Sequence, residues 1–125
     1  MKKKVLLLVG LMLCLLLVGC GKAKTKNPKD VIPDPYKYFS DANTTLLRDD
    51  EKCVYYSITK YSDSSFDKYF DACQKAGFTD IHYKNEDETI KIYRVYDSEK
   101  NFELEYKILL DNQVIEIICR ANSKK

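Results

Sequence analysis

The sequence is poor in the residue types from which most active sites are built. It contains one histidine, four glycines and three prolines, and it lacks tryptophan. The single histidine, His82, has no cysteine or aspartate at ligand spacing, which favours a surface residue over a metal ligand or an acid–base catalyst. Four glycines leave no phosphate-binding loop, and no serine lies in a G-x-S-x-G motif. The sequence therefore predicts a protein that is not an enzyme and has no cofactor.

Two further candidate sites are weak. Residues 85–88 (NEDE) offer carboxylates to a hard cation such as calcium, but they lack the D-x-D-x-D-G pattern, so a solvated turn is favoured. Cys73 has no recognisable base and is interpreted as a core residue. We therefore predict no metal site.

The first twenty residues have the layout of an export signal. Lys2, Lys3 and Lys4 precede an uncharged apolar run, residues 5–18, and Gly19 precedes Cys20. The run is shorter than the roughly 20 apolar residues of a transmembrane helix. An uncleaved signal anchor, with Cys20 at the membrane edge, is the alternative.

Residues 17–20 (LVGC) resemble the lipobox of bacterial lipoproteins. The resemblance implies that residues 1–19 are a removed signal peptide and that Cys20 becomes the acylated N-terminus. Such a lipoprotein would be held on the extracytoplasmic side of the cell membrane by its lipid.

Charge is balanced once the signal is removed. The 21 basic and 19 acidic residues become 18 and 19 without Lys2, Lys3 and Lys4, which argues against nucleic acid as a partner. Residues 20–32 are lysine-rich without an apolar period and are predicted to be a flexible linker. Their lysines can also contact anionic lipid.

Three cysteines then remain, too few for a disulfide scaffold. We predict that Cys73 and Cys119 are buried thiols, with a Cys73–Cys119 disulfide as the alternative. Cys53 is the third.

The remaining residues, 33–125, are predicted to form one domain. Pro33 and Pro35 indicate an extended lead-in whose aromatic residues pack on the domain, or a proline–aromatic partner motif. Phe66, Tyr69, Phe70 and Cys73 follow helical spacing, with Ser64 as predicted N-cap and Gly77 as the left-handed residue after the helix. Alternating apolar residues predict strands at 44–47, 53–61, 79–84, 89–96, 101–109 and 114–121.

This order predicts an α+β fold with two layers. One helix would cover one face of an antiparallel sheet of five to six strands. The segments PDPYKYF and FDKYFDACQKAGFTDI, within residues 33–84, are similar to those of small bacterial lipoproteins of unknown function. That resemblance implies an exported α+β domain and no particular activity.

Strand alternation also predicts the side chains on the face without a helix. These are Tyr55, Tyr61, Lys91, Tyr93 and Arg120, a composition that recognition surfaces favour. The alternative is that tyrosine is simply a good strand former. We expect a cell-envelope lipoprotein that presents a small binding domain to a protein, a peptide or a cell-wall glycan. The alternative is an accessory or inhibitory subunit of a membrane complex.

Overall fold

The computed structural model describes residues 26–122. The predicted signal peptide, the predicted acylation site Cys20 and residues 20–25 of the predicted linker lie outside this range. So do residues 123–125.

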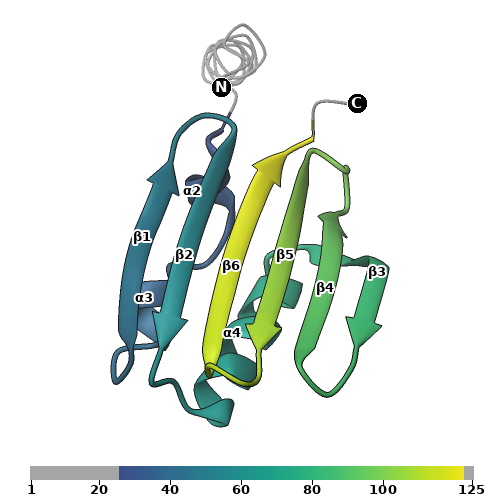
Figure 1. Cartoon of the computed structure of the whole chain (residues 1–125). Helices are drawn as coiled ribbons and strands as arrows, with labels where there is room; N and C mark the ends of the chain where they lie inside the picture. The colour runs from purple at the N-terminus through teal and green to yellow at the C-terminus, as the bar shows by residue number, and fades with distance from the viewer. Residues whose placement is uncertain (1–25, 123–125) are drawn as a thin grey trace, which may run out of the picture.

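The described chain is built around one open sheet of six antiparallel strands (Figure 1). The strands are β1 (Asn43–Asp49), β2 (Cys53–Thr59), β3 (Phe78–Glu86), β4 (Ile90–Asp97), β5 (Phe102–Leu109) and β6 (Val114–Ala121). Their spatial order is β1-β2-β6-β5-β4-β3, so the C-terminal strand lies between β2 and β5. The predicted antiparallel sheet is confirmed, with six strands near the predicted positions.

Helix α4 (Asp63–Lys75) follows β2, as predicted. Its N-cap is Ser62 rather than Ser64, and the Ser62 side chain accepts a hydrogen bond from the backbone N–H of Ser65. Tyr69 and Cys73 are fully buried on its apolar stripe. Gly77 follows the helix with φ of +108°, the conformation that glycine adopts without a Cβ clash.

Two short helices precede the sheet, so the prediction of a single helix is not confirmed. They are α2 (Pro28–Val31) and α3 (Pro35–Tyr38), and each has proline in its first turn. Proline is tolerated there because the first N–H groups of a helix have no partner within it. The expectation of an extended segment at residues 33–39 is therefore wrong for residues 35–38. Pro28 and Ile32 are buried, so the packed domain begins before residue 33 and the predicted flexible linker, residues 20–32, is wrong for residues 28–32.

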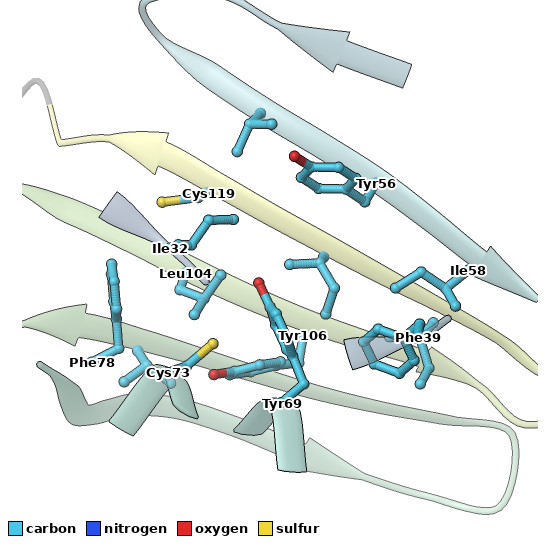
Figure 2. Close-up of a cluster of buried hydrophobic side chains, with 14 of the residues drawn as sticks. Ile32, Phe39, Tyr56, Ile58, Tyr69, Cys73, Phe78, Leu104, Tyr106 and Cys119 are labelled. Atoms are coloured by element: carbon cyan, nitrogen blue, oxygen red, sulfur yellow. The ribbon is translucent and has the colours of Figure 1, made fainter. Parts of the chain in front are cut away.

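The helices lie on one side of the sheet and leave its other face open (Figure 1). Between the helices and the sheet lies a buried cluster in which Tyr69 of α4 and Tyr106 of β5 are among the largest side chains (Figure 2). Burial of such side chains supplies the main stabilisation of the fold, at about 1.5–3 kcal/mol for each large apolar group.

The three described cysteines are all buried and free. Cys73 and Cys119 are therefore thiols within this core, as predicted, and the alternative of a disulfide between them is not seen. Burial raises the pKa of Cys73 to about 11 and also raises the pKa of Cys119. Both are protonated near neutral pH, which suits packing rather than nucleophilic chemistry.

Candidate functional site

The helix-free face is the surface of the sheet opposite α2, α3 and α4. Leu104 and Tyr106 of β5 are buried beneath the helices, so Glu105 between them points to the helix-free face. Cross-strand pairing extends one row from Glu105, to Ile118 and Tyr55 on one side and to Arg94 and Tyr83 on the other. This row crosses five neighbouring strands.

Glu105 is the centre of an ion-pair network on this face. It is only 2% exposed, although no helix covers it. Arg94 Nε lies 2.8 Å from its carboxylate, Arg120 Nη1 lies 3.6 Å away and Lys107 Nζ lies 4.0 Å away. These three cationic side chains remain 32–44% exposed, so they shield the carboxylate while keeping contact with water.

Two further glutamates extend the network along β5 and β6. Glu103 pairs with Arg120 at 3.6 Å and with Nε2 of His82 at 3.0 Å. Glu116 accepts a hydrogen bond from the Tyr55 hydroxyl and lies 3.9 Å from Lys107, and partial burial raises its pKa. Charged groups of both signs are therefore fixed across the centre of the face.

The side of this face formed by β3 and β4 carries an aromatic patch, which we define as His82, Tyr83, Arg94 and Tyr96. The His82 and Tyr96 rings are stacked, with centroids 3.9 Å apart and planes 14° apart. The Arg94 guanidinium lies 4.6 Å from the ring centroid of Tyr83, within cation–π distance, and Tyr83 remains 40% exposed. The patch therefore combines rigid aromatic surface with a charged group already held in place.

A β-bulge places His82 and Tyr83 together. The pairing of β3 with β4 shifts between Ile81 and Tyr83, so that His82 is the extra residue. A bulge lets two consecutive side chains escape strict alternation. His82 reaches Tyr96 and Glu103 while Tyr83 packs on Arg94, so both contribute to the helix-free face.

The structure brings only part of the predicted binding face together. Tyr55 and Arg120 lie on the helix-free face and join the network described above. Tyr61 follows β2 and packs against the buried core instead. Cys20, the predicted acylation site, lies outside the described residues.

The predicted orientation of Lys91 and Tyr93 is wrong. Tyr93 pairs with buried Tyr106 and makes an edge contact with Phe70 of α4, at 6.4 Å between ring centroids. Lys91 pairs with Ile108, whose side chain is also directed towards the helices. Both residues are thus on the helix side, because the pairing of β4 with β5 places them opposite helix-side residues. The predicted alternation of β4 was off by one residue, which exchanges the two faces.

Sequence reasoning missed most of the aromatic patch. His82 was interpreted as an isolated surface residue, and Tyr83, Arg94 and Tyr96 were not assigned to any site. The cations that bury Glu105 come from β4 and β6 as well as β5. Their convergence depends on strand order, which local patterns do not encode.

The turn predicted at residues 85–88 is shorter in the structure, because Asn85 and Glu86 still pair with β4 as the end of β3 and the turn begins at Asp87. The Asp87 carboxylate accepts hydrogen bonds from the backbone N–H groups of Thr89 and Ile90 and from the Thr89 hydroxyl, and these bonds lower its pKa. Within residues 26–122 no cluster of three potential metal ligands is found. None of the helices in this range has the length and apolar character needed to cross a membrane.

No protein-family model, curated protein or solved structure matches the chain.

Proposed function

We propose that the protein is a lipid-anchored binding domain of the bacterial cell envelope that recognises its partner through the helix-free face. The observation that carries this proposal is the aromatic patch beside the Glu105 ion-pair network. Tyrosine and arginine are the residue types most enriched at the energetic centres of protein interfaces. They are displayed here on paired strands, not on a mobile loop.

The patch is preorganised for binding. Arg94 is held by its hydrogen bond to Glu105 and by the Tyr83 ring, and the Tyr96 ring is fixed by stacking on His82. A partner would therefore order few additional side chains on binding, which lowers the entropic cost of association. The same contacts favour a binding role over the alternative that these tyrosines only stabilise strands.

The charges of the face favour a protein or peptide partner. Glu103, Glu105 and Glu116 are balanced by Arg94, Arg120 and Lys107, so the network offers no uniformly basic surface to a nucleic acid. Alternating charges beside aromatic rings suit a surface that carries both polar and apolar groups. A cell-wall glycan, which stacks on aromatic rings without needing the charges, is the competing ligand.

The extracytoplasmic position is supported by the N-terminal sequence. The basic residues 2–4, the apolar run 5–18 and the lipobox-like residues 17–20 follow one another without interruption. Acylation of Cys20 would anchor the domain, since two or more acyl chains hold a protein stably on a bilayer.

Site-specific photocross-linking in intact membranes tests the binding role. A photoreactive residue replaces Tyr83 on the helix-free face or, as the matched control, exposed Lys68 on α4. We expect a discrete protein adduct from position 83 and none from position 68. Arg94→Gln, introduced together with the probe at position 83, should reduce the adduct because it removes the group that holds the patch.

The adducts also separate the alternatives. If the protein captured from position 83 also co-purifies with the chain in mild detergent without cross-linking, the accessory-subunit function is indicated. Equal adducts from positions 83 and 68 contradict recognition by the helix-free face. Adducts to glycan alone replace the protein partner by a cell-wall ligand.

A further inference from the structure

A cleft lies on the helix side of the sheet, away from the helix-free face. The cleft has a volume of about 700 Å³ and is lined by Lys26 and Asn122, the first and last described residues. The described chain begins and ends at the same end of the sheet (Figure 1). Val31 of α2, Phe78 of β3 and Phe102 of β5 supply the apolar lining of the cleft. Its volume is in the range of ordinary ligand pockets, but it is open to solvent rather than enclosed.

The charged residues that line the cleft are mainly acidic. Four carboxylates, those of Asp30, Glu51, Asp97 and Glu99, face one ammonium group, that of Lys26. Asp97 accepts a hydrogen bond from the backbone N–H of Phe102, and Glu99 accepts one from the Asn101 side chain. Asp30 and Glu51 form no ion pair or side-chain hydrogen bond with another residue in the range 26–122. The cleft therefore presents excess negative charge beside apolar surface.

The chain that precedes the described residues is basic and starts at this cleft. Lys26 is itself a lining residue, and the segment immediately before it, residues 22–25 (KAKT), contains two lysines and no acid. An extended chain spans about 3.3–3.6 Å per residue, so Lys22 and Lys24 are both within reach of the cleft.

We propose that residues 22–25 dock in this cleft, with the ammonium groups of Lys22 and Lys24 paired with its carboxylates. Covalent attachment at Lys26 gives the segment a high effective concentration at the cleft, so individually weak ion pairs suffice to hold it there. A separate cationic ligand would have to displace this segment. Docking would make the predicted linker a part of the domain.

Docking would also orient the domain. Where Cys20 carries a lipid, only Gly21 separates the anchor from the docked segment. The cleft end of the sheet would then lie next to the membrane. The lysines would be neutralised by the protein's own acids instead of by anionic lipid. This inference does not depend on what the helix-free face binds.

Photocross-linking of the full chain in membranes tests the docking. A photoreactive residue replaces Ala23, and cross-linked peptides are identified by mass spectrometry. We expect cross-links to residues 97–102 or to residue 51. The double substitution Glu51→Lys and Glu99→Lys should lower their yield by about threefold or more, as expected for the loss of two exposed ion pairs. About 0.5 M salt should have a similar effect, because exposed charges are strongly screened there.

The matched control makes the same charge change at the other end of the molecule. Asp41→Lys with Glu88→Lys replaces two exposed acids far from the cleft and should leave the yield unchanged. Thermal unfolding establishes that both double variants fold. Equal yields in the two double variants would overturn the proposal. Cross-links from position 23 to the helix-free face would also overturn it. Cleft cross-links obtained only from a probe at position 123 would overturn it as well, because they would assign the cleft to the C-terminal lysines.

Discussion

Neutralising Glu105 is the most direct test of the ion-pair network. Glu105→Gln keeps the shape of the side chain and removes only its charge. The carboxylate is 2% exposed and receives a hydrogen bond from Arg94 Nε at 2.8 Å, with Arg120 and Lys107 within 4.0 Å. We expect Glu105→Gln to destabilise the fold.

Two opposing effects set how much Glu105→Gln lowers the free energy of unfolding. A hydrogen bond to a charged group contributes about 1.5–3 kcal/mol, and a neutral amide retains part of it. Burial of the charge has a desolvation cost that Glu105→Gln relieves. The three cations are 32–44% exposed and keep much of their hydration, so we expect attraction to the carboxylate to dominate. The net loss should be about 1–2 kcal/mol, or roughly 4–16 °C in Tm for a domain of about 100 residues.

Urea unfolding of the full chain in one detergent, followed by circular dichroism, measures this loss. Arg94→Gln and the double variant complete a double-mutant cycle, in which we expect a coupling energy of about 1 kcal/mol. Glu103→Gln is the matched control. Glu103 is 22% exposed and its arginine partner lies at 3.6 Å, while an amide oxygen can keep the contact with His82 Nε2 at 3.0 Å, so its loss should be smaller.

Unchanged or increased stability of Glu105→Gln would contradict the expected net stabilisation by the network. It would mean that desolvation of the buried carboxylate exceeds its attraction to the three cations. A coupling energy near zero would separately show that Glu105 does not hold Arg94. The aromatic patch would then not be preorganised.

Three further predictions concern the core and the anchor. Tyr69→Phe removes the hydroxyl that donates to the Pro33 carbonyl at 2.9 Å, and should lower the free energy of unfolding by about 1 kcal/mol in the same urea assay. Burial raises the pKa of Cys73 to about 11, from about 9 in the unfolded chain, because the fold prefers the protonated thiol. The resulting stabilisation is complete below pH 9 and is lost as the pH rises towards 11. Between pH 9 and 11 this group should lower the free energy of unfolding by up to about 3 kcal/mol, so Cys73→Ala should depend less steeply on pH. Parallel pH dependences of the two proteins would contradict the raised pKa of Cys73. Cys20→Ser should abolish labelling by radioactive fatty acid and leave the precursor uncut, and a labelled Cys20→Ser protein would disprove the lipoprotein proposal.

Local sequence patterns located most of the regular elements. The spacing of Phe66, Tyr69, Phe70 and Cys73 predicted α4, and Gly77 has the left-handed backbone expected after a helix. These signals are local, because helical periodicity, strand alternation and a helix end depend on residues close together in the chain. The same local reasoning missed α3, since Pro35 was interpreted as a residue that prevents a helix, whereas it occupies the first turn of one.

The positions of the strands and of the main helix thus followed from local patterns, as did the placement of Tyr55 and Arg120 on the helix-free face. The orientation of β4 followed from tertiary packing, because Ile90 and Ile92 alternate with Tyr93 and Val95 and both sets are apolar. Pairing of Tyr93 with Tyr106, beneath Phe70, selected one set for the helix side. The burial of Glu105 was decided in the same way, by cations that three different strands bring to one carboxylate. Such choices depend on contacts between residues far apart in the chain, and a local pattern does not contain them.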